Sequence, residues 1–223
     1  MATKKKKPAR RMVKKTKPVK TKSKPTAILI TGVPGTGKTT LCQNWCAREG
    51  WVHLALNDLV ENQGLYSGID EEDMSKVVRL PAMEQAANQW LSKQVKPVLV
   101  DGHTGCEVRL NVSRVLVLRL HPGELARRLQ ARGYSPAKVQ TNKMTELLDY
   151  CTVQSIRNYG AAKVFELDVS GNTEAQTLAA FAEFMKSKTP GPKFKPHVDW
   201  SAQLFKEVDV YRPPEPAGRV HRV

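Results

Sequence analysis

The chain has 223 residues, of which 40% are hydrophobic and 26% charged, a composition typical of one globular domain with room for tails. No segment approaches the roughly 18–20 apolar residues that span a bilayer, and the first residues lack the apolar stretch of a secretory signal, so we expect neither a membrane protein nor a secreted one. The net charge of +15 is uneven. Residues 1–25 hold twelve Lys or Arg and no acid, which leaves 24 basic and 21 acidic residues, or +3, for the rest.

Residues 1–25 are rich in Lys, Thr and Pro and contain almost nothing to bury, so we expect a disordered basic arm. A polycation of this density binds phosphates, with an affinity that falls steeply with salt. The arm has no aromatic residue on which a base could stack, which argues against sequence-specific reading. We expect an arm that contacts RNA; the other interpretations are a nuclear address, a linker and a solvated tail.

The ordered part is expected to begin with the apolar run Ala27–Thr31, a buried strand directly before a Gly-rich loop. Four more strands are expected at residues 51–56, 97–101, 115–120 and 163–167. Helices are expected at residues 39–48, over most of 57–95 with a turn at 64–68, at 123–132, from 136 to 157, and at 173–186. Strands that alternate with helices predict a three-layer α/β fold around a five-stranded parallel sheet.

These elements predict one domain at residues 26–188. From Thr189 the composition changes to a Pro-rich extension, 189–223, in which residues 197–211 carry aromatic side chains and are expected to dock as a short helix. The four cysteines show no metal-ligand spacing, which suits a reducing compartment. The acids at 70–73 are interpreted as helix N-terminal charge rather than a metal site.

The segment Gly32–Thr39 fits the pattern G-x-x-x-x-G-K-[S/T] of a phosphate-binding loop. Gly35 and Gly37 let the backbone turn tightly and point its N–H groups at phosphate oxygens, and the N-terminus of the next helix adds positive potential. Lys38 is expected to reach the β- and γ-phosphates. Thr39 offers a hydroxyl to Mg²⁺, and Thr40 an α-phosphate contact. The sequence therefore predicts binding of ATP with Mg²⁺.

Asp101 ends the apolar strand Pro97–Asp101, and His103 follows two residues later. In phosphate-loop proteins an Asp at this position holds Mg²⁺. An unperturbed histidine titrates near pH 6.5, so His103 is a candidate for positioning water or carrying a proton. The alternative for His103 is a histidine that merely fits at a strand end.

Two arginines on the helix after the fourth strand are candidates for phosphate binding. Arg128 and Arg132 are four residues apart and share a helix face, whereas Arg127 points elsewhere. Arginines that close over a phosphoryl group stabilise its charge during transfer. The Gly133–Pro136 break predicts a short hinged lid. The alternative is an ordinary solvated basic face.

The motifs together resemble one family, the small adenylate kinase isoenzyme 6-type proteins of eukaryotic nuclei and archaea. The matching segments are TGVPGTGKTT at 31–40, LNDL at 56–59, LYSGIDEE at 65–72, VDGHTG at 100–105, VLRL at 117–120 and RLQARGYSPAKVQTN at 128–142. The resemblance covers about residues 26–186, and FKEVDVY at 205–211 also looks like the extension of archaeal members.

The resemblance implies an adenylate kinase (ATP + AMP = 2 ADP) with ATPase activity and a role in maturing the small ribosomal subunit, in contact with one of its proteins and with rRNA. It implies ATP contacts at Gly35, Gly37, Lys38, Thr39, Thr40 and Arg132, a Walker B-like pair at Asp101 and His103, an AMP segment at about 55–78 and a lid at about 131–141. It also suits a cytoplasmic protein, or a nuclear one in a eukaryote, that is a monomer or weak oligomer.

The AMP segment departs from the family pattern. Lys76, Arg79 and Pro81 stand where relatives carry acidic residues, and Glu61 stands where an arginine is sometimes present. These departures leave a second hypothesis, an ATPase switch that binds a ribosomal protein and rRNA with little transfer to AMP. A kinase for another small acceptor is a third.

Overall fold

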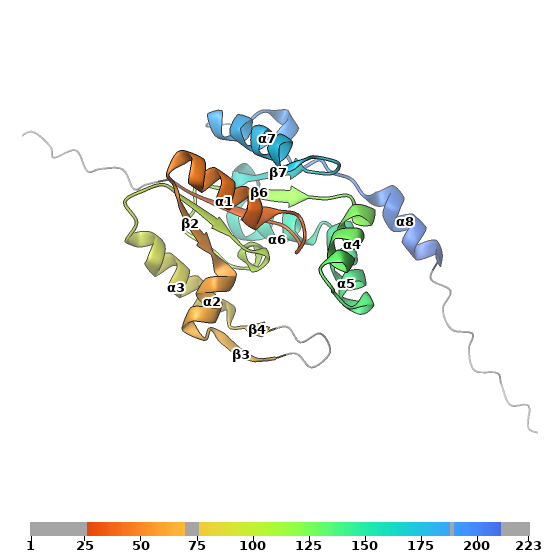
Figure 1. Cartoon of the computed structure of the whole chain (residues 1–223), viewed down its shortest axis with the longest axis horizontal. Helices are drawn as coiled ribbons and strands as arrows, with labels where there is room; N and C mark the ends of the chain where they lie inside the picture. Colours follow the sequence, from red (N-terminus) through yellow and green to blue (C-terminus); the bar gives the residue numbers. More distant parts are fainter. Residues whose placement is uncertain (1–25, 70–75, 188–189, 211–223) are drawn as a thin grey trace, which may run out of the picture.

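The computed structural model describes residues 26–69, 76–187 and 190–210, with side chains of the last helix through 207 (Figure 1). The predicted basic arm at 1–25, the acids at 70–73 and the last prolines of the extension lie outside the described residues. In the described part, no helix is long and apolar enough to cross a membrane.

The centre of the molecule is a five-stranded parallel sheet in the order β2-β5-β1-β6-β7. The three central strands are almost wholly buried, as their continuous apolar sequences predict. The strands are β1 (Ala27–Thr31), β2 (Val52–Ala55), β5 (Val98–Asp101), β6 (Arg114–Arg119) and β7 (Val164–Asp168).

Helices cover both faces of this sheet. Successive residues of a strand point to opposite faces, and on β7 Phe165 contacts Phe184 of α7 while Glu166 accepts a hydrogen bond from Thr152 of α6. α7 packs beside α1, so these two helices form one layer and α6 lies in the other (Figure 1). The helices are α1 (Lys38–Glu49), α2 (Leu56–Gln63), α3 (Leu80–Ser92), α4 (Pro122–Ala131), α5 (Pro136–Leu147), α6 (Tyr150–Tyr159), α7 (Glu174–Lys186) and α8 (Ser201–Val210). The predicted three-layer α/β fold is confirmed.

The segment between β2 and β5 differs from the prediction of a mostly helical stretch. Between α2 and α3 the chain forms an antiparallel hairpin of β3 (Tyr66–Ile69) and β4 (Lys76–Val78). Both strands are short, and their sequences YSGI and KVV do not alternate apolar with polar residues, so the pattern that would mark a half-buried strand is missing.

The long helix predicted from 136 to 157 is also wrong, because it is two helices that break at Leu148–Asp149. Asp149 adopts a left-handed conformation with φ of 53°, which Asp tolerates better than most residues with a side chain. Its carboxylate binds the Arg119 guanidinium, so an ion pair accompanies the break.

A group of ion-paired side chains lies at the end of β6. We call it the Arg119 cluster, and its members are Arg119, Glu146, Asp149 and Glu166. Arg119 ends β6 with a side chain only 1% exposed; its Nε lies 2.8 Å from Oε1 of Glu146, and its Nη1 binds Glu166. Burial lowers the pKa of Arg119, but attraction from Glu146 and Glu166 outweighs burial and raises it. The ion pairs offset the hydration that these charged groups lose on burial.

The C-terminal extension completes this cluster. The backbone N–H groups of His197 and Val198 donate to Oε2 of Glu166 at 2.8 and 3.0 Å, and the expected short helix forms as α8. α8 packs against α5, where Lys143 pairs with Glu207 at 2.5 Å. Residues 190–207 are therefore fastened to the sheet and to α5.

Candidate functional site

The phosphate-binding loop joins β1 to the N-terminus of α1. Gly32 has φ of 130°, and a Cβ there would lie 2.4 Å from the carbonyl oxygen of Leu118 on β6, so the loop leaves the sheet where only glycine fits. The Lys38 side chain folds back, and its Nζ donates to the carbonyl oxygen of Val33 at 2.9 Å. The hydrogen bond from Lys38 thus holds the loop in a curve.

The sheet register places Asp101 beside the loop. Asp101 pairs with Ile30 of β1 on one side and Ala55 of β2 on the other, and parallel strands end at the same edge. Asp101 and His103 consequently share a cavity of about 230 Å³ with the loop. This phosphate cavity is lined by Pro34, Gly35, Gly37, Lys38, Thr39, Thr40, Asn57, Asp101, Gly102, His103, Arg132 and Tyr134.

Burial lowers the pKa of two groups that line this cavity. It lowers the pKa of Lys38, against the opposing attraction of Cys151, Asp101 and Cys42. Burial, with the positive charges of Lys38 and Lys138, lowers the pKa of His103 to about 4. At neutral pH His103 is therefore an uncharged imidazole, which can donate a hydrogen bond from one ring nitrogen and accept one at the other but adds no positive charge.

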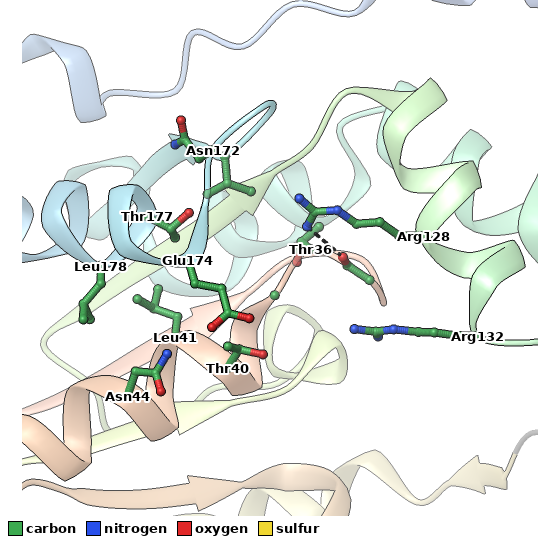
Figure 2. Close-up of a pocket in the computed structure, with 13 residues that line it drawn as sticks. Thr36, Thr40, Leu41, Asn44, Arg128, Arg132, Asn172, Glu174, Thr177 and Leu178 are labelled. Carbon is green, nitrogen blue, oxygen red and sulfur yellow. Dashed lines mark hydrogen bonds between the residues drawn. The ribbon is translucent and has the colours of Figure 1, made fainter.

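α4 directs two arginines at the loop. Its buried stripe of Leu125 and Leu129 packs under Gly35. Arg128 pairs with Glu124 at 2.6 Å, and its Nη1 lies 3.5 Å from the carbonyl oxygen of Gly35. Arg132 extends toward the loop from the end of the helix (Figure 2). Both arginines line a second cavity beside the loop, as their shared helix face predicts.

This second cavity, of about 260 Å³, lies between α1, α4 and the start of α7 (Figure 2). It combines apolar walls with polar side chains, which suits a planar heterocyclic base. The residues that line this base cavity are Gly35, Thr36, Gly37, Thr40, Leu41, Asn44, Arg128, Arg132, Val169, Asn172, Glu174, Thr177 and Leu178. Sequence reasoning missed Asn44 and the residues after β7. Asn172 and Glu174 flank Thr173, the N-cap residue of α7, so the start of this helix was the sequence signal that could have located them.

A third cavity, of about 410 Å³, lies on the other side of His103. It is lined by Asn57, Val60, Glu61, Lys76, Val78, Leu80, His103, Thr104 and Glu107, and it coincides with the predicted AMP segment. We call it the acceptor cavity. Among the described lining residues its one Lys or Arg is Lys76, which pairs with Glu61. Arg79 donates to the carbonyl oxygen of Gly64 instead.

The predicted site residues thus come together. Gly35, Gly37, Lys38, Thr39, Thr40, Asp101, His103 and Arg132 share the phosphate cavity, and Arg128 lies next to it. Their catalytic and binding roles stay predictions. Thr39 and Asp101 fit the Mg²⁺ assigned to them, because one offers an exposed hydroxyl and the other a carboxylate whose buried Oδ2 accepts no hydrogen bond in the described residues.

Comparison with known proteins agrees with this geometry. A family model described as an AAA domain matches residues 28–149. A protein of Methanocaldococcus jannaschii named "putative adenylate kinase" is 32% identical over 178 residues, which is 80% of this chain and 94% of that protein. A protein of the same name from Halobacterium salinarum is 35% identical over 153 residues, covering 69% of this chain and 86% of that protein.

Among solved structures, thymidylate kinase from Candida albicans aligns with a TM-score of 0.52 at 13% identity, over 74% of this chain and 93% of that one. At this identity the likeness speaks for the fold alone. The motifs, the sheet order and the two archaeal relatives define the family of this chain more narrowly than that structural likeness does. The chain belongs to the adenylate-kinase-like family of phosphate-loop proteins.

Proposed function

We propose that the protein is an adenylate kinase that transfers the γ-phosphoryl group of Mg²⁺-bound ATP to AMP. One observation carries the proposal: the three cavities form a chain that centres on the loop. The base and phosphate cavities share Gly35, Gly37, Thr40 and Arg132, and the phosphate and acceptor cavities share Asn57 and His103. Transfer between two nucleotides needs this end-to-end arrangement of two sites.

Each residue then has a distinct task. The N–H groups of the loop and the start of α1 bind the phosphates of ATP, and Lys38 adds its charge to the β- and γ-phosphates. Thr39 and Asp101 would hold Mg²⁺, which when bound neutralises phosphate charge. Arg132 lines both the base and the phosphate cavities, and it stabilises the negative charge of the γ-phosphoryl group during transfer. The neutral imidazole of His103 orients the acceptor oxygen by donating a hydrogen bond from its ring N–H.

The reaction needs no covalent enzyme intermediate. An α-phosphate oxygen of AMP forms a bond to the γ-phosphorus, the bond to the β–γ bridging oxygen breaks, and that oxygen leaves on ADP. Incubation with ATP and Mg²⁺, with and without AMP, tests this while ADP and inorganic phosphate are followed. We expect AMP-dependent ADP without matching phosphate, and no product from Lys38→Ala. Phosphate release that is indifferent to AMP would overturn the kinase assignment.

The acceptor cavity favours a second candidate, an ATPase switch in the maturation of the small ribosomal subunit. A nucleoside monophosphate brings two negative charges, and Lys76, already paired with Glu61, is the one Lys or Arg among the described lining residues. In this alternative the partners are a small-subunit ribosomal protein and rRNA, with residues 1–25 as an RNA-binding arm. Deletion of residues 1–25 should then abolish salt-sensitive RNA binding; unchanged affinity would contradict this role of the arm.

Three further parts of the proposal rest on the family resemblance and on composition. Residues 26–188 form the kinase domain, 189–223 its extension and 1–25 a basic arm. The protein acts in the cytoplasm, or in the nucleus of a eukaryote. It is a monomer or weak oligomer, which sedimentation of the full chain would test.

A further inference from the structure

His53 lies next to Asp101 beneath the phosphate cavity. It belongs to β2, two residues before Ala55, which pairs with Asp101 across the sheet. Nε2 of His53 is 3.4 Å from Oδ2 of Asp101, and the two side chains are 19% and 5% exposed. Nothing in the phosphate-loop motif or in the predicted catalytic set includes this histidine.

Neither atom has a hydrogen-bond partner in the described residues, although they lie only 3.4 Å apart, and both are buried. Polar atoms inside proteins are nearly always hydrogen-bonded, because an unpaired one costs about 1–3 kcal/mol. The nearby Lys38 donates to the carbonyl oxygen of Val33 instead. The imidazole N–H is therefore the natural donor to this carboxylate oxygen.

Cys42 of α1 completes a group of three, whose ligand atoms all lie within 4.8 Å of one another. Such a trio resembles a transition-metal site, which requires a thiolate. Cys42, however, is 0% exposed within the hydrophobic core, where burial raises the pKa of its thiol and disfavours the thiolate. The group is better described as an imidazole–carboxylate pair beside an apolar neighbour.

We propose that His53 is a positioning residue for Asp101, donating from Nε2 to Oδ2 and thereby fixing the orientation in which the carboxylate faces the phosphate cavity. This inference rests on the proposed role of Asp101 toward Mg²⁺. A carboxylate turns freely about its last torsion, and a partner on one oxygen removes that freedom. Loss of a group that orients a metal ligand typically costs about 10–100-fold in metal affinity or activity.

The test compares His53→Leu with His53→Gln at saturating ATP. Leu removes the donor, whereas the Nε2 amide of Gln can reach the same oxygen. We expect His53→Leu to raise the Mg²⁺ concentration at half-maximal turnover by about tenfold or more. His53→Gln should bring it back to within about threefold of the wild-type value, since it restores a neutral N–H donor. An unchanged midpoint in His53→Leu, or equal shifts in both variants, overturns the inference.

Cys42→Ala is the matched control, because it disturbs the same packing without removing the donor. Its Mg²⁺ midpoint should match wild type, and a shift as large as that of His53→Leu would assign the effect to packing. If His53→Leu does not fold, His53→Asn, whose shorter amide cannot reach Oδ2, takes its place. Mg²⁺-dependent binding of a fluorescent ATP analogue is measured in parallel. Absence of Mg²⁺-dependent turnover in the wild type contradicts the proposed function, whereas a Mg²⁺ response in binding that His53→Leu leaves unchanged contradicts the inference alone.

Discussion

The indole Nε1 of Trp200 donates to Oε1 of Glu146 across 3.0 Å, and both side chains are buried. The same oxygen accepts from Nε of Arg119 on β6 at 2.8 Å. One carboxylate oxygen thus joins the extension, α5 and the central sheet. Burial raises the pKa of Glu146 despite the opposing effects of Arg119, Trp200 and the Leu120 backbone, so each donor matters to its ionisation.

Trp200→Phe should lower the free energy of unfolding by about 1–3 kcal/mol more than a matched Trp→Phe change that loses no hydrogen bond. Trp45 provides the match, because it is similarly buried at 6% against 8% exposed and its Nε1 has no partner in the described residues. Urea unfolding of Trp200→Phe and Trp45→Phe measures the difference. Equal losses would mean that the indole hydrogen bond contributes nothing.

Arg119→Met should destabilise the fold by about 3–5 kcal/mol at neutral pH, because Glu146 and Glu166 would be left buried and unpaired. In the wild type, burial raises the pKa of Glu166, but Arg119, Thr152 and the backbone of Val198 outweigh it, so the net shift is downward. The stabilisation from this lowered pKa is fully present at pH values above the pKa of Glu166 in the unfolded chain. It is lost as the pH falls through the pKa of Glu166 in the folded protein.

The stability gap between Arg119→Met and wild type should therefore narrow with falling pH. Without the guanidinium, the folded pKa values of both carboxyls rise, so the variant gains stability relative to the wild type as they protonate. Unfolding curves from pH 8 to pH 5 check the sign. A gap that widens toward acid would contradict this account of the Arg119 cluster.

Two glycines of the loop should respond differently to alanine. Gly32→Ala should unfold or severely destabilise the protein, since its Cβ would lie 2.4 Å from the backbone oxygen of Leu118. Gly37 has φ of 93° but nothing within 4 Å of an added Cβ, so Gly37→Ala should cost only about 1–2 kcal/mol of backbone strain. Because Gly37 lines the phosphate cavity, that variant should fold yet bind ATP more weakly. Thermal melts and ATP titration separate the two outcomes.

Arg132→Ala should lower kcat by about 100-fold or more, because Arg132 lines both the base and the phosphate cavities. Arg127→Ala is the control: this exposed arginine is on the same helix but lines neither cavity. Steady-state kinetics with ATP and AMP distinguish them. Similar rates for the two variants would assign the Arg132 guanidinium to the solvated surface.

Local sequence predicted the sheet and the phosphate-binding loop because both depend on short-range signals. The apolar run Ala27–Thr31 and the glycines after it fix a strand and a loop within a dozen residues. The β3–β4 hairpin has no such signal, since Val77 is 48% exposed and Gly68 interrupts the alternation. The break at Asp149 follows no Gly or Pro and coincides with an ion pair to Arg119, thirty residues away.

The residues of the candidate site were likewise only partly predictable from local sequence. Lys38, Asp101 and Arg132 follow from motifs, but the cavities that hold them depend on distant segments. Glu174 joins the base cavity only because α7 returns beside α1. His53 is an ordinary strand residue until the register of β2 and β5 sets it beside Asp101. Pairings between segments far apart in the chain leave no periodic pattern, so sequence reasoning missed them.

The hydrogen bonds from His197 and Val198 to Glu166 bear on how the protein is made. A growing chain that has reached Asp168 contains all five strands of the sheet, including Glu166 and Arg119, which pair in the folded protein. Two of the donors to Glu166, and the indole that binds Glu146, follow about thirty residues later in synthesis. During elongation the chain therefore passes through a stage in which every strand of the sheet has been synthesised but some donors to its internal carboxylates have not. Cleavage by a protease during translation should be greatest at that stage and decline once Trp200 has joined the fold.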